Sequence, residues 1–471
     1  MHFLLILAVL ATLVSSESAG SEPISYPGFR LLLVIAGMLL APSAAWVASA
    51  SLADRLRQGP FQRHAVLGAL AVVRRLHAGL WLVVAGVTVW GLGWPRLVRC
   101  NWHLRGSLLL DDLLILVPVL LPLVLSWAAF YEVDRELRRD PAAGDDAAGP
   151  PTRCRYLLLH VRHDLGLVLV PVFALLAVQD AGELAMPGLR KTPPGVALQV
   201  CVLLLLILLL PAILRRLWTT RPLPAGPLRT RLEQAARRAG FRARDILVWH
   251  SDGMIVNAAV TGFLPWLRYV FLSDGLLAQL SEEEVRAVFG HEMGHLRHRH
   301  LPLRVSAMLA PVSLWLLVCQ IAPPVVEQVT GTVISGGLHN ATQVGLLALM
   351  AMASYVLLVF GPYCRLLEGQ ADLFGCRSLA WESPPQPIGT FIDALENLAR
   401  TSGIDRNARS WQHASIARRV EFLKRVAEDP DYEVEFQRRV RSLSALILAV
   451  LVSPLAWQLL MLAQRHAGTI Q

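Results

Sequence analysis

The segment His291-Glu292-Met293-Gly294-His295 combines residue types that can bind a metal ion and activate water. Residues four apart share one face of a helix, so His291 and His295 can direct their rings at a single ion. Zinc accepts such imidazole ligands and lowers the pKa of a water bound to it toward about 7. Glu292, beside the first ligand, can take the proton of that water. Since chance gives only about 0.016 matches to this spacing in a chain of this composition, we favour a zinc centre over a helix with solvated histidines.

A catalytic zinc ion needs a third protein ligand and an open fourth position. We predict Glu368 as that ligand, because the two apolar runs between it and His295 would form a hairpin that returns the chain to the same side of a membrane. Glu368 and Asp372 are again four apart, in a helix expected to begin after a break at Gly361-Pro362. Asp372 could accept a hydrogen bond from the second ring nitrogen of a ligand histidine. The alternative interpretation is a helix with two ordinary surface acids.

The helix that carries the first motif has a clear predicted start. Ser281 can cap it, and Glu284, three residues later, completes a capping box. His298 and His300 lie beyond the motif and do not share its geometry, so we expect both to be solvated.

The polar region before this helix is expected to contain a small sheet. Residues 228–240 have helical spacing and end at Gly240. Three short segments rich in β-branched and aromatic residues follow, separated by turn signals, at residues 246–250, 254–260 and 269–272.

The chain as a whole is far more apolar than a soluble enzyme. Among 471 residues, 54% are hydrophobic and only 17% are charged, and the mean hydropathy is +0.48. Soluble domains carry about 25% charged residues. The composition therefore argues against a soluble enzyme and against a disordered chain. Six cysteines without C-x-x-C spacing indicate neither a disulfide scaffold nor a cysteine zinc site.

The apolar residues form runs close to the length that crosses a bilayer. After a short apolar stretch at residues 3–14, which fits either a signal peptide or an N-terminal anchor, eight candidate spans follow. They lie near residues 31–53, 79–94, 113–130, 165–178, 195–214, 305–325, 342–363 and 443–463.

The placement of arginine orients these spans. The basic residues concentrate in loops, so the net charge of +9 indicates a membrane lipid partner and no nucleic-acid partner. The nearly uncharged residues 324–341 are expected outside the cell, whereas the loop 95–112 disagrees, because its three arginines are only partly offset by Asp111 and Asp112. Three regions are expected in the cytoplasm: residues 131–162, 215–300 and 364–442.

The region from about residue 225 to 425 resembles a family of membrane zinc metallopeptidases. This family includes the type I CAAX prenyl endopeptidases and the HtpX-type quality-control proteases. The resemblance rests on motifs in a fixed order: Asn257-Ala258, Leu272-Ser-Asp-Gly-Leu-Leu277, Ser281-Glu-Glu-Glu-Val285, the zinc helix, Arg365-Leu-Leu-Glu368 with Ala371-Asp372, and His413 with Arg419.

The resemblance implies roles for the matching residues. It implies one zinc ion per chain, with Glu368 as the third ligand and Asp372 as the acid behind a ligand. His413 and Arg419 would stabilise the oxyanion or bind the substrate carbonyl, although residue chemistry alone leaves a structural role open for both. The stretch 254–262 would be an edge strand that binds an extended substrate, with the binding residues Val256, Asn257, Ala258 and Ala259.

We therefore predict a mainly α, multi-span helical membrane protein. It would carry a zincin (gluzincin-like) α+β metallopeptidase domain that is interrupted by a transmembrane hairpin. The expected parts are a signal peptide or anchor at 1–16, about five spans at 17–224, the peptidase domain at 225–425 with the hairpin near 305–363, and one span at 426–471.

The predicted function is that of a zinc metalloendopeptidase in the cell (inner) membrane, with its active site facing the cytoplasm. Membrane-associated or hydrophobic polypeptides are the expected substrates, in quality control first and in CAAX-type processing second. Two alternatives remain open at this point. One is a signal-sensing membrane protease that cleaves a regulator, and the other is a transporter or a non-catalytic scaffold.

Overall fold

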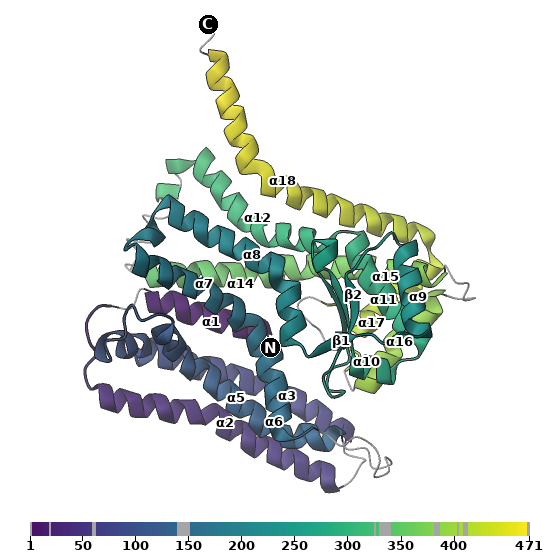
Figure 1. Ribbon diagram of the computed structural model, residues 1–471, viewed down its shortest axis with the longest axis horizontal. Coiled ribbons are helices and arrows are strands. Elements are labelled where there is room, and N and C mark those ends of the chain that lie inside the picture. Colours follow the sequence, from purple (N-terminus) through teal and green to yellow (C-terminus); the bar gives the residue numbers. More distant parts are fainter. Residues whose placement is uncertain are drawn as a thin grey trace. The chain divides into compact units, whose positions relative to one another are not determined.

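Figure 1 shows the computed structural model of the chain. It describes residues 2–17, 20–58, 63–138, 151–324, 326–328, 341–380, 387–402, 405–407 and 413–468. Most of the loop 324–341 lies outside these residues, so its expected position is not described. The chain divides into two compact units, one of Met1–Trp218 with Asn340–Leu349 and one of Thr219–His339 with Met350–Gln471.

The first unit consists of helices. Its α-helices are α1 (His2–Glu17), α2 (Pro27–Gln58), α3 (Arg63–Gly86), α4 (Trp94–Arg96), α5 (Leu110–Arg138), α6 (Arg153–His160), α7 (Gly166–Ala185) and α8 (Pro193–Leu217). Short π- and 3-10 turns join several of them, at Val87–Gly91, Leu97–Asn101, Val161–Leu165 and Leu189–Lys191.

Helix α5 is the centre of this unit and packs against α1, α2, α3 and α6. The side chains of Phe130 and Val133 are buried in a cluster with residues of α2 and α3. Arg99, one of the arginines in the loop that disagreed with the predicted orientation, pairs with Asp111 at 2.7 Å and with Asp112 at 2.8 Å. Its positive charge is thus neutralised inside the unit, which removes its weight as a topology signal.

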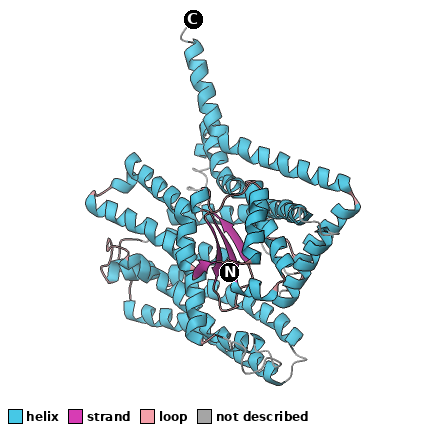
Figure 2. Cartoon of the chain, turned by 45° about the vertical axis from the view of Figure 1, so that its right-hand side comes forward, coloured by secondary structure: helices cyan, strands magenta, loops and turns pink. Residues whose placement is uncertain are grey.

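The second unit contains the sheet, whose strands are magenta in Figure 2. Its order is β1-β2-β4-β3, with β2 and β4 parallel and the outer pairs antiparallel. The strands are β1 (Thr220–Pro222), β2 (Asp245–Trp249), β3 (Ala258–Thr261) and β4 (Tyr269–Ser273). The three expected strands correspond to β2, β3 and β4, although β3 is shorter than expected and β1 was not anticipated.

Helices surround this sheet and continue beyond it. They are α9 (Pro227–Arg238), α10 (Asp274–Gln279), α11 (Glu282–Arg297), α12 (His300–Ile321), α14 (Ala341–Tyr355, which begins in the first unit), α15 (Gly361–Ala380), α16 (Pro387–Ser402), α17 (Ile416–Glu428) and α18 (Pro430–Gly468). Helices α9 and α11 share one core with the sheet, in which Leu232, Leu272 and Phe289 are fully buried. Helix α11 also packs along α15 and α16.

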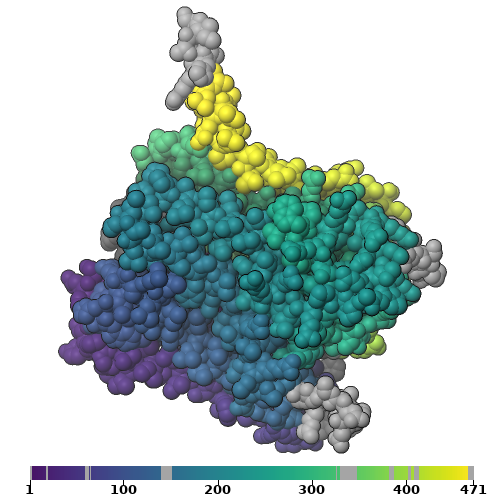
Figure 3. All heavy atoms as spheres, viewed as in Figure 1, coloured from purple at the N-terminus to yellow at the C-terminus, as the bar shows by residue number. Residues whose placement is uncertain are grey.

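Eight helices among the described residues are long and apolar enough to cross a membrane. Each overlaps one of the eight expected spans, so the multi-span, mainly helical fold with a small α+β portion is confirmed. The eight are Pro27–Gln58, Ala65–Gly91, Leu110–Arg138, Arg153–Ala185, Pro193–Leu217, His300–Ile321, Leu347–Ala380 and Pro430–Gln464. In Figure 3 the C-terminal part of α18 stands clear of the rest of its unit, and Leu455 and Leu459 there are exposed.

One expectation about this region is wrong. The predicted break at Gly361-Pro362 does not occur, because a π-turn at Val356–Phe360 carries α14 directly into α15. Pro362 is tolerated there since it lies in the first turn of α15, where its missing N–H would have had no helical partner within that helix.

Candidate metal centre

Helix α11 begins as the sequence predicts. The side chain of Ser281 accepts a hydrogen bond from the Glu284 N–H, and the Glu284 carboxylate accepts one from the Ser281 N–H, so the capping box is complete. Two glycines on α11 then face α15 directly. A Cβ added at Gly290 would lie 3.2 Å from Gly375 Cα, and one at Gly294 would lie 2.9 Å from Ala371 Cα. The two backbones therefore approach more closely than side chains on both helices would permit.

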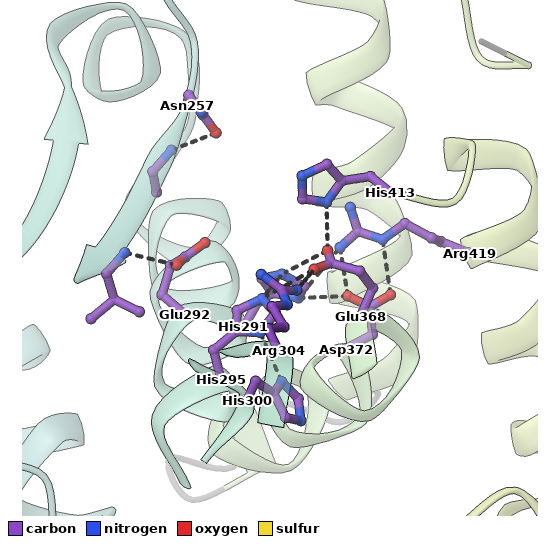
Figure 4. A network of polar contacts seen from close by, with 12 residues as sticks. Asn257, His291, Glu292, His295, His300, Arg304, Glu368, Asp372, His413 and Arg419 are labelled. Atoms are coloured by element: carbon purple, nitrogen blue, oxygen red, sulfur yellow. Dashed lines mark hydrogen bonds and ion pairs between the residues drawn. The ribbon is translucent and has the colours of Figure 1, made fainter. Parts of the chain in front are cut away.

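This close approach brings the three predicted ligands together. The Nε2 atoms of His291 and His295 lie 3.1 Å apart. Glu368 Oε2 lies 3.6 Å from His291 Nε2, and Glu368 Oε1 lies 3.5 Å from His295 Nε2. All three side chains are largely buried, and Figure 4 shows them directed toward one another from α11 and α15.

These spacings suit a tetrahedral ion. Bonds of about 2.0–2.1 Å to zinc separate two ligand atoms by about 3.3–3.4 Å. The observed separations of 3.1, 3.5 and 3.6 Å lie on both sides of that value. Two imidazoles and one carboxylate are also the donor set of a hydrolytic zinc site. The residues present therefore fit zinc in both chemistry and spacing.

The ring of His291 is fixed from behind by a buried ion pair. Its Nδ1 lies 2.7 Å from Asp372 Oδ1, and Arg419 Nε donates to Asp372 Oδ2 at 2.8 Å. Burial alone would lower the pKa of His291, but the Asp372 carboxylate raises it to about 9. Asp372 thus contacts the second ring nitrogen of His291, and Arg419 lies on the far side of Asp372.

Glu292 points from α11 to the edge of the sheet. Its Oε2 accepts a hydrogen bond from the backbone N–H of Val260 at 3.1 Å. That N–H belongs to β3, the end strand of the described sheet, and is directed away from β4. Burial raises the pKa of Glu292 to about 7, against the opposing effect of His291. A carboxylate with such a pKa is suited to exchange protons near neutral pH.

Glu368, the predicted third ligand, has two further partners. Arg304, at the start of α12, donates to Glu368 Oε1 at 2.6 Å. His413 Nδ1 lies 2.8 Å from Glu368 Oε2, and the ring of His413 is more than half exposed. Arg304 was not singled out from the sequence, where an arginine beside an apolar run indicates topology. Its contact with the Glu368 carboxylate makes Arg304 part of the candidate site.

The predicted substrate residues lie at or beside β3. Ala258 and Ala259 are in the strand, paired with Leu272 and Phe271 of β4. Val256 and Asn257 precede it in an irregular segment. The Asn257 side chain accepts a hydrogen bond from the Ala258 N–H, as Figure 4 shows.

Comparison with known proteins identifies this region. Residues 222–426 match the profile of peptidase family M48. This region is similar to the M48 peptidases. A protease HtpX homolog from Aeropyrum pernix is 35% identical over 140 residues, and one from Thermoplasma acidophilum is 30% identical over 146 residues. The family resemblance predicted from the motifs is thereby confirmed.

The matches to these M48 proteases cover only part of each chain. They span 28% of this chain and 43% of the A. pernix protein, and 30% of this chain and 42% of the T. acidophilum protein. A crystal structure of Ste24p from S. mikatae aligns with 85% of this chain and 100% of its own, at 15% identity and a TM-score of 0.48.

One prediction about the end of the H-E-x-x-H helix is wrong. His300 is not solvated but only 1% exposed. Helix α11 ends at Arg297, and Arg299 adopts a left-handed conformation (φ 55°) before α12 begins at His300. This turn directs the His300 ring back toward His295, whose Nδ1 lies 2.8 Å from His300 Nδ1. His298 is partly buried and stacks on His300.

Proposed function

We propose that the chain is a membrane-embedded zinc endopeptidase of the H-E-x-x-H…E type with one zinc ion per chain. His291, His295 and Glu368 hold the ion, and Glu292 acts as general base. The observation that carries this proposal is the meeting of three side chains from two helices, in which the two Nε2 atoms lie 3.1 Å apart and each lies 3.5–3.6 Å from one of the Glu368 oxygens. The M48 match supports it independently.

In this proposal, each residue around the ion has a separate role in peptide hydrolysis. When bound, zinc supplies Lewis acidity that polarises a carbonyl and lowers the pKa of water. Glu292 accepts a proton from the attacking water and delivers it to the leaving amine. The hydrogen bond from Val260 orients the Glu292 carboxylate for both transfers. His413 is exposed beside Glu368, where it can donate to the developing oxyanion.

The placement of β3 supports an extended polypeptide substrate. The Val260 N–H at its outer edge already faces Glu292, so a chain added along that edge would pass the general base. Ala258, Ala259 and the preceding Val256 and Asn257 would bind its backbone. Arg419 is a positioning residue in this proposal, since it donates to Asp372.

The location of the site favours substrates that enter from a membrane. The candidate span of α12 begins at His300, five residues after the ligand His295. We therefore propose that the protein is a multi-pass protein of the cell membrane, surrounded by lipid, with the site facing the cytoplasm. Membrane-associated or hydrophobic polypeptides are the proposed substrates, as in quality control, and the relatives named as protease HtpX homologs favour this assignment.

The test is cleavage of an unfolded reporter protein by the detergent-purified full chain, with zinc content measured in parallel. We expect the wild type to cleave the reporter and Glu292→Gln to lose this activity while retaining one zinc. The matched control is Glu283→Gln, which removes an exposed acid from the first turn of the same helix. It should leave both cleavage and zinc content unchanged.

The possible outcomes separate the alternatives. Equal cleavage by the wild type and Glu292→Gln would show that another catalyst is responsible and would refute the mechanism. Cleavage of prenylated peptides without cleavage of the unfolded reporter would replace quality control by CAAX-type processing. Zinc binding without cleavage of either substrate would refute a broad peptidase and favour a protease for one regulator or a non-catalytic scaffold.

A further inference from the structure

The two histidine ligands are supported in different ways. His291 is backed by the charged pair of Asp372 and Arg419. His295 has no carboxylate in the equivalent place among the described residues, because its Nδ1 faces His300 Nδ1 at 2.8 Å. The support of His295 is therefore a neutral side chain that was not expected from the sequence.

His300 is part of a series of hydrogen-bonded side chains that extends away from His295. His300 Nε2 lies 2.9 Å from Gln370 Oε1, and Gln370 Nε2 donates to Gln437 Oε1 at 2.6 Å. This hydrogen-bonded series joins four helices, because His295 is in α11, His300 in α12, Gln370 in α15 and Gln437 in α18. His300 and Gln370 are 1% and 6% exposed, so water cannot readily replace these partners.

Each of these contacts has only one consistent direction once His295 is a ligand. A ligand nitrogen at Nε2 must be unprotonated, so the proton of His295 lies on Nδ1 and is donated to His300. His300 must then accept at Nδ1 and carry its own proton on Nε2, which it donates to Gln370 Oε1. The amide of Gln370 in turn donates to Gln437. No atom in this hydrogen-bonded series has to act as donor and acceptor at once.

We propose that His300 and Gln370, anchored by Gln437, form a relay that fixes the tautomer and ring orientation of the metal ligand His295. This proposal rests on the proposed zinc site and assigns positioning residues to it. Partners that orient a metal-bound histidine typically change metal affinity or activity by about 10- to 100-fold when they are removed.

The experiment measures zinc affinity of the full chain in detergent by competition with a chelator. We expect His300→Leu, which removes the acceptor, to weaken zinc binding about 10- to 100-fold. His300→Asn places an amide oxygen near the position of the lost Nδ1 acceptor, so it should restore affinity to within about threefold of the wild type. Gln370→Leu leaves His300 in place but removes the acceptor that fixes the position of the His300 ring proton. Its zinc affinity should lie between those of His300→Leu and His300→Asn.

A second readout reports on the ligand rather than on folding. Cobalt(II) in place of zinc gives visible absorption bands that depend on the ligand geometry, and these should change in His300→Leu and return in His300→Asn. The matched control is His298→Leu, since the His298 ring stacks on His300 with centroids 5.7 Å apart. Within the described part of the chain, it makes no hydrogen bond to a metal ligand, so zinc affinity should stay at the wild-type value.

The outcomes distinguish the relay from the metal site itself. If the wild type binds no zinc, or if His291→Ala binds it equally well, the zinc site fails and the relay with it. If the wild type binds one zinc, and His300→Leu matches its affinity and its cobalt spectrum, the relay alone is refuted. Equal losses in His300→Asn and His300→Leu would also refute it, because the acceptor would then not be what matters.

Discussion

Gly294→Ala tests how the two ligand-bearing helices are held together. A Cβ at this position would lie 2.9 Å from Ala371 Cα, 3.0 Å from the Ala371 carbonyl oxygen and 3.1 Å from Phe374 Cβ. The two atoms of Ala371 belong to the backbone of α15 and cannot rotate away. Carbon atoms pack at about 3.5–4.0 Å, so α11 and α15 must separate locally by about 0.6 Å, the difference between 3.5 and 2.9 Å.

Such a separation acts on the metal site. His291 and His295 would move together, since both are in α11, but Glu368 is in α15. Its distance of 3.5 Å from His295 Nε2 would grow toward about 4.1 Å, whereas metal–ligand distances vary by only about 0.2 Å. Overpacking costs about 1–3 kcal/mol, which corresponds to zinc binding weakened about 5- to 150-fold.

The assay is zinc competition together with thermal unfolding of the metal-free chain. Alanine is intrinsically favoured over glycine in a helix by about 0.5–1 kcal/mol. Helix propensity alone would therefore make Gly294→Ala more stable, so a loss of stability would point to the close packing. The matched control is Gly369→Ala beside the ligand Glu368. The three heavy atoms nearest to its Cβ would belong to the aromatic rings of Phe436 and Phe422, which can shift. Wild-type zinc affinity and stability in Gly294→Ala would refute the close-packing account.

Two further predictions concern the ion pair behind His291. Arg419→Leu leaves the buried Asp372 carboxylate without its cation and should destabilise the chain by about 3–5 kcal/mol, measured by thermal unfolding. The exposed neighbour Arg418→Leu should have little effect, and lost activity with unchanged stability in Arg419→Leu would indicate instead a direct role in substrate binding. Because the pKa of His291 is raised to about 9, zinc must displace a proton below that pH, and apparent zinc affinity should rise about tenfold per pH unit between pH 6.5 and 8.5. The same raised pKa means that the contact between protonated His291 and Asp372 stabilises the metal-free chain fully below about pH 6.5, and that this stabilisation is lost as the pH rises through 9. A zinc affinity independent of pH would mean that His291 is neutral in the metal-free chain.

The local features of the site could be predicted because they depend on neighbouring residues. The capping box needs only Ser281 and Glu284, and the shared face of His291 and His295 follows from the helical repeat. The apolar runs likewise gave all eight candidate spans. The placement of Glu368 required one non-local argument, that a hairpin returns the chain to the same side.

The features that escaped prediction depend on backbone conformations that the pattern does not encode. Helical periodicity continues through His300, but the left-handed conformation of Arg299 ends α11 and turns the next helix back over the site. The π-turn at Val356–Phe360 passes Gly361-Pro362 without the expected break. Strand β1 has only three residues, Thr220–Pro222, which is too few for an alternating pattern to be recognised.

The contacts of the candidate site imply that the proposed peptidase chemistry depends on the candidate membrane spans. His291, Glu292, His295 and the Val260 N–H come from the polar region before residue 300. Glu368 and its partner Arg304 lie in helices that are candidate spans.

Hydrogen bonds also connect these candidate spans to one another. Ser313 of α12 donates to the Leu451 carbonyl of α18 at 2.7 Å, and Tyr363 of α15 lies 2.8 Å from Ser444 of α18. A fragment that ended before α12 would keep two histidines and the base but lose the third ligand and every side chain that orients it. The packing of these candidate spans therefore belongs to the proposed active site, and conditions that change this packing should weaken metal binding before they affect the sheet.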